Sequence, residues 1–260
     1  MLNYDRISAA MTGLSWDGRL HLLDRTDSTN YHAKDLARQG HPHGTVVLAE
    51  EQTMGRGRAG RRFSSPRGLG LYATFLLRPD LPPEALLHMT AMAAVAACRA
   101  VERTCAAAPR IKWTNDIILG GKKLGGVLTE FSSGALILGI GLNVHHRGAD
   151  FPSDVAPIAT SLFLETGCHF SRSALACCLM DEIFQMWQGL LSQKEDYLRR
   201  YEGLCLTVGQ DIIIHRPGEA IPAHCTGLDG DGSLLVRYAD GSGGIISAGD
   251  VSIRTPEGYL

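Results

Sequence analysis

The sequence predicts an α/β protein in which a mixed β-sheet domain, with helices packed on one side, precedes a small β-barrel. Three observations support this prediction. Apolar and β-branched runs alternate with helical patterns across residues 1–202. Across residues 203–260, short β-rich runs recur between glycine-containing turns, and no helical pattern fits. A chain of 260 residues with 45% apolar and 20% charged residues can bury the cores of one large and one small domain.

The individual elements of the first domain follow from local patterns. Apolar runs predict strands over residues 20–23, 45–49, 71–77, 110–113, 116–119, 122–131 and 135–144. The pair Gly120-Gly121 predicts a tight hairpin turn. Helices are predicted over residues 28–40, 82–105 and 172–191, with a charged helical turn at 194–200. Capping side chains at Asp27 to Asn30 begin the first helix, and Pro82-Pro83-Glu84 suits the first turn of the second.

Composition excludes several classes of protein. The formal net charge of −2 argues against a surface built for nucleic acid. The seven cysteines are odd in number and form no C-x-x-C pair, which favours buried, reduced thiols over a zinc site or a disulfide framework. No signal peptide is visible, and the most apolar window, residues 85–100, contains His88 and Arg99 and is too short to span a bilayer. We therefore expect a cytoplasmic protein without a membrane partner.

The segment from Glu50 to Arg62 is the most informative part of the chain. Its eight residues from Gly55 to Arg62 include three glycines and four arginines. Glycine allows a ligand to approach the backbone closely, and arginine binds carboxylate and phosphate oxygens in pairs. A segment this charged and flexible is poorly suited to a core. We therefore expect a loop that becomes ordered over an anionic small molecule.

Two other interpretations of this loop are weaker. Gly55, Gly57 and Gly60 fit the dinucleotide-binding pattern G-x-G-x-x-G, but that mechanism requires a strand that leads directly into a helix. Here the segment after the glycines, residues 63–70, contains a proline and two glycines and cannot be helical. An arginine-rich nucleic-acid segment would need interleaved aromatic residues, and only Phe63 is present.

Four further segments flank the loop in a fixed order, and together the five motifs resemble the biotin–protein ligases. The segments are Asp27-Ser-Thr-Asn30, Lys112-Trp-Thr-Asn-Asp116, Lys122-Lys-Leu-Gly-Gly-Val-Leu128 and Gly139-Ile-Gly-Leu-Asn-Val144. Each motif alone is weak, but five in order over residues 20–165 are specific. The resemblance implies that the last domain is an SH3-like β-barrel. It also implies an ATP-dependent ligase that forms biotinyl-5'-AMP and then biotinylates a lysine of a biotin carboxyl carrier protein.

The resemblance assigns residues to the reacting acids. Lys123 and Arg58 match catalytic positions that contact both the biotin carboxylate and the phosphate oxygens, and Arg56 matches a loop position with the same two contacts. Gly57 lies between the two arginines at the carboxylate, and Arg61 belongs to the ATP side. Joining two anions requires nearby cations, which agrees with these residue types. Considered alone, Lys122 and Lys123 could instead be solvated charges beside a hairpin turn.

Further residues are implied at the two ends of the substrate. Ser28, Thr29, Asn30, Gln52 and Gly126 match positions that bind biotin, and hydroxyl and amide groups complement its ureido ring. Lys112, Asn115 and Asn143 match positions around ATP. Asp116 matches a position from which it could accept a proton from the carrier lysine. Ser28 and Thr29 could also be a simple helix cap, and Asp116 a turn cap.

The family pattern is not matched everywhere. Family members commonly have proline at position 114 and tryptophan at position 63, where this chain has Thr114 and Phe63. Neither change removes a charged group. About 19 residues precede the first predicted strand, too few for the DNA-binding domain of some relatives, so no DNA partner is expected. Mg²⁺ is expected with ATP without a certain protein ligand, and the resemblance allows a homodimer. A lipoate or octanoate ligase, or a sensor without catalysis, are the alternatives.

Overall fold

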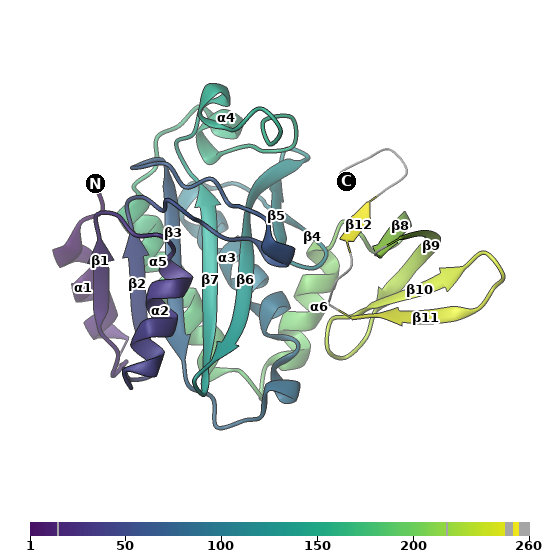
Figure 1. Ribbon diagram of the computed structural model, residues 1–260, viewed down its shortest axis with the longest axis horizontal. Coiled ribbons are helices and arrows are strands. Elements are labelled where there is room, and N and C mark those ends of the chain that lie inside the picture. Colours follow the sequence, from purple (N-terminus) through teal and green to yellow (C-terminus); the bar gives the residue numbers. More distant parts are fainter. Residues whose placement is uncertain (15, 217, 248–251, 255–260) are drawn as a thin grey trace.

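The computed structural model describes residues 1–14, 16–216, 218–247 and 252–254 (Figure 1). Its α-helices are α1 Tyr4–Gly13, α2 Thr29–Arg38, α3 Met89–Cys105, α4 Leu162–Thr166, α5 Arg172–Gln188 and α6 Lys194–Leu204. Short 3-10 helices are η1 Arg58–Gly60, η2 Pro83–Leu86 and η3 Gly148–Asp150. The strands are β1 Leu20–Leu23, β2 Thr45–Ala49, β3 Gly70–Leu77, β4 Arg110–Lys112, β5 Asp116–Leu119, β6 Lys122–Ser132, β7 Ala135–Asn143, β8 Asp211–Arg216, β9 Glu219–Leu228, β10 Leu234–Tyr238, β11 Gly243–Ile246 and β12 Ser252–Arg254.

Within the described residues, seven strands form a mixed sheet in the order β1-β2-β3-β7-β6-β5-β4. Only β1 and β2 are parallel, and the other neighbours are antiparallel. Hairpin connections explain the long run from β4 to β7. Gly120 and Gly121, with φ of 56° and 76°, form the predicted tight turn between β5 and β6. The α/β class with a mixed sheet is confirmed.

Helices cover both faces of this sheet, so the prediction of helices on one side is wrong. Helices α3 and α5 lie behind the sheet in Figure 1, and α2 lies in front of it. Residues alternate between the faces along each strand. In β2, Val46 and Leu48 join the large core under α3 and α5, whereas Val47 packs with Ala33 and Leu36 of α2 in a second, smaller core. The sequence shows that these residues are apolar but not which helix covers them.

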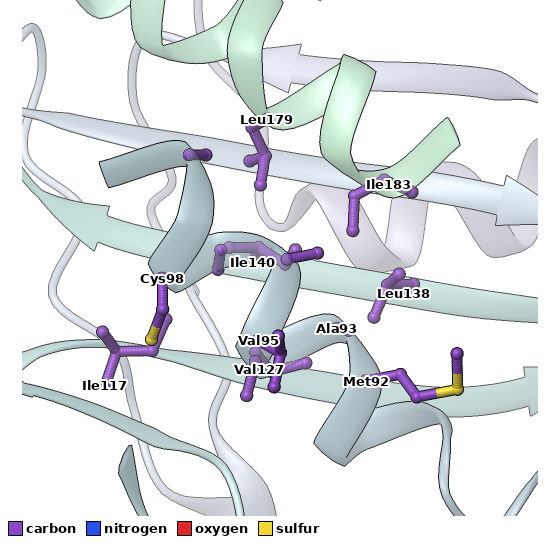
Figure 2. Packing of buried hydrophobic residues seen from close by; sticks show 14 of the residues in the cluster. Met92, Ala93, Val95, Cys98, Ile117, Val127, Leu138, Ile140, Leu179 and Ile183 are labelled. Atoms are coloured by element: carbon purple, nitrogen blue, oxygen red, sulfur yellow. The ribbon is translucent and has the colours of Figure 1, made fainter. Parts of the chain in front are cut away.

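The large core is built around α3. Figure 2 shows Val95 of α3 against Val127 of β6, and Cys98 of α3 against Ile117 of β5. All four are at most 1% exposed. Segment Pro83–Cys105 is 23 residues long and apolar enough to cross a membrane, so the prediction that this region is too short is wrong. However, 72% of its apolar window is buried inside the protein. Its hydropathy therefore reflects a core helix packed on both sides.

Helix α1 was not predicted from the sequence. Its first turn is capped by the Asn3 side chain, which accepts a hydrogen bond from the Arg6 backbone N–H. Ile7 and Met11 then pack into the large core. The helix has only two buried residues, so its apolar pattern is too sparse to indicate a helix before the tertiary contacts are known.

The end of the chain, where a small β-barrel is predicted, forms a separate β-sheet that begins after α6. Within the described residues, five strands are antiparallel in the order β11-β10-β9-β8-β12. This sheet lies beside α6 (Figure 1). Its β9–β10 turn contacts the first domain, because Trp113 Nε1 donates to the Gly232 carbonyl at 2.9 Å.

Cys205 and Cys225 are buried thiols, as are Cys98 and Cys105, but Cys168 is exposed.

Candidate functional site

The front face of the sheet carries a pocket because three strand residues on this face are glycines. Gly126 of β6 pairs with Gly141 of β7, and Gly139 lies two residues before Gly141 in the same strand. All three line the pocket. A Cβ at Gly139 would lie 2.1 Å from Asn30 Oδ1, and one at Gly141 would lie 2.6 Å from the Phe63 ring. The glycines therefore allow α2 and the arginine-glycine loop to approach the sheet around a cavity.

A bulge in β6 brings Lys123 to this pocket. The register between β5 and β6 shifts, so that Ile117 pairs with Gly125 but Ile118 pairs with Lys123. Leu124 is the extra residue and stays in the core. Without the bulge, Lys123 would share the core face with Gly125. With it, the Lys123 side chain passes over Gly126, and its Nζ lies 2.5 Å from Asp116 Oδ1.

The Lys123 backbone is held from both sides. Its N–H donates to the Ile158 carbonyl at 2.7 Å, and its carbonyl accepts from the Thr160 N–H at 2.9 Å. These bonds tie the segment after η3 to the start of β6. The ammonium is 28% exposed and its Asp116 partner 16%, so the pair lies at the pocket wall rather than in bulk solvent.

The arginine-glycine loop is a narrow hairpin at the pocket mouth. Gly57 N–H donates to the Arg61 carbonyl at 2.7 Å, and Phe63 N–H donates to the Gly55 carbonyl at 2.9 Å. A Cβ at Gly55 would lie 2.3 Å from the Phe63 carbonyl oxygen, so the two arms need glycine at this position. The tip turns through Ala59, whose φ is 51°. The predicted loop thus has an ordered base formed by its own backbone.

The loop arginines are directed along opposite sides of the pocket. Arg58 Nη1 lies 3.4 Å from Asn115 Oδ1, beside the β4–β5 turn. Arg56 Nη1 lies 3.3 Å from Glu130 Oε1, and its guanidinium lies 4.6 Å from the centre of the Tyr31 ring. The loop therefore carries two fixed positive charges at different ends of one cavity.

A buried polar cluster forms one end of the pocket. Gln52 Oε1 accepts hydrogen bonds from the Thr29 N–H at 2.8 Å and the Thr29 hydroxyl at 3.0 Å. Thr74 Oγ1 lies 2.7 Å from Asn30 Oδ1 and 2.9 Å from Thr29 Oγ1. Ser28 occupies the N-cap position of α2, but its side chain makes no capping hydrogen bond. Ser28 therefore has the N-cap position that the sequence suggested without the capping bond, and it also lines the pocket.

The other end of the pocket is formed by the β4–β5 turn and the end of β7. Asn115 Nδ2 donates to the Val127 carbonyl at 2.8 Å, which fixes the turn against β6. Asn143 Nδ2 donates to the Thr160 carbonyl at 2.9 Å. Lys112 is 4% exposed but still reaches the pocket lining. Trp113 also lines this end.

All predicted site residues line this one pocket, and the role of each one stays a prediction. They are Ser28, Thr29, Asn30, Gln52, Arg56, Gly57, Arg58, Arg61, Lys112, Asn115, Asp116, Lys123, Gly126 and Asn143. They come from α2, the loop after β2, and strands β4 to β7, which are far apart in sequence.

An apolar wall was missed. It is formed by Phe151, Val155, Ile158 and Ala159, which follow η3 and line the pocket beside Ile140. The segment has no helical or strand periodicity and contains Pro152 and Pro157, so no sequence pattern marked it. Its only signal is the presence of apolar residues in an otherwise polar loop.

A buried histidine supports this wall and predicts a pH dependence. His146 is fully buried, and its ring stacks on Phe151 with centroids 4.9 Å apart. Neither ring nitrogen has a hydrogen-bond partner among the residues that the structure describes. Burial lowers the pKa of His146 to about 4. The unfolded chain, with a histidine pKa of about 6.5, therefore binds the proton first as pH falls.

We expect the free energy of unfolding to decrease as pH falls from about 6.5 to about 4, with up to about 3 kcal/mol from His146. The variant His146→Phe should show a shallower decrease, because it keeps an aromatic ring but cannot bind a proton. Urea unfolding between pH 8 and pH 4.5 measures both curves. Identical pH dependence in the two proteins would contradict the assignment.

Comparisons with known proteins identify the family of the chain. The biotin/lipoate A/B protein ligase family model matches residues 22–146. The chain is 32% identical to bifunctional ligase/repressor BirA of Bacillus spizizenii, over 88% of this chain and 73% of that protein. It is 34% identical to biotin–[acetyl-CoA-carboxylase] ligase of Paracoccus denitrificans, over 83% of this chain and 93% of that protein. The structure also resembles the solved biotin protein ligase of Aquifex aeolicus in complex with biotin and ATP, with a TM-score of 0.80 and 30% sequence identity. The match covers 91% of this chain and 99% of that chain. The chain belongs to the biotin/lipoate A/B protein ligase family.

Proposed function

We propose that the chain is a biotin–[carboxyl carrier protein] ligase. One observation carries this proposal: a single pocket has a buried hydroxyl and amide cluster at one end, where Arg56 also lies, and the cations Lys123 and Arg58 further along it. A neutral heterocycle with polar edges fits the first part, and two acids fit the second. The similar proteins of Paracoccus denitrificans and Aquifex aeolicus are a biotin–[acetyl-CoA-carboxylase] ligase and a biotin protein ligase seen with biotin and ATP, which supports the same substrates.

The reaction has two steps. In the first, a biotin carboxylate oxygen attacks the α-phosphorus of ATP, a new O–P bond forms, and pyrophosphate leaves. In the second, the amine of a carrier lysine attacks the acyl carbon of biotinyl-5'-AMP. A C–N bond forms, the C–O bond to the phosphate breaks, and AMP leaves. The nitrogen must lose a proton in this step because lysine is protonated at neutral pH.

The cations make the first step feasible. Carboxylate and phosphate repel each other, and this repulsion is strong in a pocket with apolar walls. In this proposal Lys123 contacts oxygens of both groups, and its ion pair with Asp116 at 2.5 Å supports this role because it holds the ammonium at the pocket wall. Arg58 approaches from the loop side, next to Asn115. Fixed cations lose little energy to reorganisation when charge moves between the reacting groups.

Asp116 connects the two steps. Its carboxylate orients the Lys123 ammonium in the first step and then accepts or orients the proton of the carrier amine in the second. Around ATP, Lys112, Asn115, Asn143 and Arg61 bind phosphate and ribose oxygens. Gln52 and residues 28–30 bind the ureido ring, Gly57 lies at the biotin carboxylate, and Gly126 also contacts biotin.

Mg²⁺ accompanies ATP in this proposal. Within the described ranges, no group of three His, Cys, Asp or Glu residues could hold a metal ion. The donor set of the pocket is instead dominated by amides and cations. Bound together with ATP, the ion would be held mainly by phosphate oxygens and water. Its contribution is to neutralise phosphate charge.

The remaining assignments extend the same proposal. Residues 1–202 form the catalytic domain, and residues 203–260 form a small SH3-like domain that holds the β4–β5 turn through the Trp113–Gly232 hydrogen bond. The protein substrate is the biotin carboxyl carrier protein of a biotin-dependent carboxylase, and the reaction takes place in the cytoplasm.

The test is binding and turnover with defined ligands. Titration calorimetry should detect binding of biotin and tighter binding of a non-hydrolysable biotinyl-adenylate mimic. Biotin should then support exchange of pyrophosphate into ATP, and addition of a carrier domain should yield a biotinylated lysine. Lipoate and octanoate serve as competitors. Exchange supported by either of them but not by biotin would reject the proposal in favour of a lipoate-type ligase.

Ligand binding should also order the loop further. Its hairpin has only a few backbone hydrogen bonds and a tip with exposed residues, so its amides should exchange readily in the free protein. Bound carboxylate and phosphate oxygens would tie Arg56 and Arg58 down. We expect slower hydrogen exchange over residues 55–62 with biotin plus ATP. The same exchange rates with and without ligands would contradict the proposed closure.

A further inference from the structure

A polar residue outside the predicted site connects its parts. Glu130 lies on the front face of β6, opposite Ile137 of β7, and its side chain is 20% exposed. Its Oε1 accepts from Lys34 Nζ at 2.7 Å and from Arg56 Nη1 at 3.3 Å. Its Oε2 accepts from Asn30 Nδ2 at 3.0 Å. One carboxylate therefore holds both a pocket amide and a loop arginine.

The ionised carboxylate determines how Asn30 is oriented. A carboxylate only accepts hydrogen bonds, so the Asn30 amide must direct its NH₂ group toward Glu130. Its Oδ1 then faces the Thr74 hydroxyl at 2.7 Å. The three donors around Glu130 outweigh the effect of burial and lower the pKa of its carboxyl group. The charge that orders Asn30 is thus present at neutral pH.

The hydrogen bonds continue from Asn30 back to the loop. Thr74 contacts Thr29, Thr29 donates to Gln52, and Gln52 Nε2 donates to Ser65 Oγ at 2.8 Å. The Ser65 hydroxyl donates to the Phe63 carbonyl at 3.0 Å. Arg56 and Phe63 lie on opposite arms of the loop hairpin. The chain of contacts therefore starts on one arm, crosses the floor of the pocket, and ends on the other.

We propose that Glu130 is a positioning residue that fastens the arginine-glycine loop to the polar end of the pocket. It holds the Arg56 guanidinium and the Asn30 amide in fixed relation, so the loop and the ring-binding groups are ordered together. This role deepens the proposed function and rests on it. Buried polar chains of this kind are effective only when every member is paired, so loss of one charge should affect both ends.

The test compares Glu130→Gln with the wild-type protein in two measurements. The glutamine keeps the shape but removes the charge that binds Arg56 and Lys34. We expect the dissociation constant for biotin to increase by about 10-fold to 100-fold, in line with a lost charge-assisted bond plus disordering of Asn30. We also expect faster hydrogen exchange over residues 55–62 in the ligand-free protein. The second measurement needs no ligand.

Matched variants separate positioning from general stability. Glu102→Gln removes a comparable carboxylate, 2.7 Å from Arg200 on the helical side, and should change neither measurement. Glu130→Asp keeps the charge and should restore part of the affinity. The double variant Glu130→Gln with Arg56→Gln should lose less biotin-binding free energy than the sum of the two single variants, because both substitutions break the same Arg56–Glu130 contact.

Clear outcomes would overturn the role of Glu130. The first is a Glu130→Gln variant with the biotin affinity and loop hydrogen exchange of the wild-type protein. The second is a double variant with Arg56→Gln in which the two effects on biotin affinity are additive. The third is a loss of biotin affinity that is explained by a lower melting temperature alone. A wild-type protein that does not bind biotin would instead reject the proposed function. In that case, unchanged loop exchange in ligand-free Glu130→Gln would still reject the positioning role, and faster exchange would support it.

Discussion

Replacement of Lys123 by alanine should reduce biotin-dependent exchange of pyrophosphate into ATP by about 10²-fold to 10³-fold or more. The effect should be large because the proposed mechanism has this ammonium contact both reacting acids, and loss of one fixed donor in such a site commonly has this magnitude. The β6 bulge directs it into the pocket beside Asp116. Exchange is measured with labelled pyrophosphate at saturating biotin and ATP.

The neighbouring lysine provides the control for this prediction. Lys122 is exposed, does not line the pocket, and has the same charge. Lys122→Ala should therefore keep near-normal exchange, which separates the position of the charge from its sign. Lys123→Ala with near-normal exchange and unchanged biotin affinity would reject the proposed role of Lys123.

Replacement of Arg58 by glycine should accelerate release of biotinyl-5'-AMP by about 10²-fold, the size expected when a charged partner of the phosphate is lost. Arg58 reaches from the loop to the Asn115 side of the pocket, so its guanidinium bridges loop and pocket. Without it, the adenylate should escape and acylate unrelated lysines in solution. Biotinylation of serum albumin added as a bystander protein measures this release.

Two further variants identify the cause of such a release. Arg58→Ala removes the guanidinium without adding the backbone freedom of glycine, so it should produce most of the same effect. Arg58→Lys keeps one charge but loses the paired donors and should lie between them. Normal adenylate retention in Arg58→Ala would show that backbone flexibility, not the lost guanidinium, caused the effect.

Much of the candidate site could be predicted because its residues occur in short motifs. The loop from Gly55 to Arg62 combines a composition and a charge that no core segment has. The Gly120-Gly121 turn is local, so the hairpin that carries Lys123 follows from two residues. Local chemistry was sufficient for these features because each involves residues close together in the chain.

Other parts of the site depend on contacts between distant segments. Glu130 is 74 residues from Arg56 and 100 from Asn30, and nothing in its own neighbourhood indicates either partner. The apolar wall around Phe151 and Ile158 is formed by a loop without periodicity. Helix α2 covers the front face only because Val47 and Ile137 point toward it. Such relationships arise from packing and are not visible in a local pattern.

The amino-acid sequence by itself determined the class of fold, the strands and most helices, and the residues that carry charge and polarity into the site. Only the tertiary structure decided which face of the sheet holds the pocket and that a bulge at Leu124 turns Lys123 toward Asp116. The physical reason is the two-residue period of a strand, in which one inserted residue moves the following side chains to the opposite face. The Lys123 backbone is held in this arrangement by its pairing with β5 and by its hydrogen bonds to Ile158 and Thr160, which are distant in sequence.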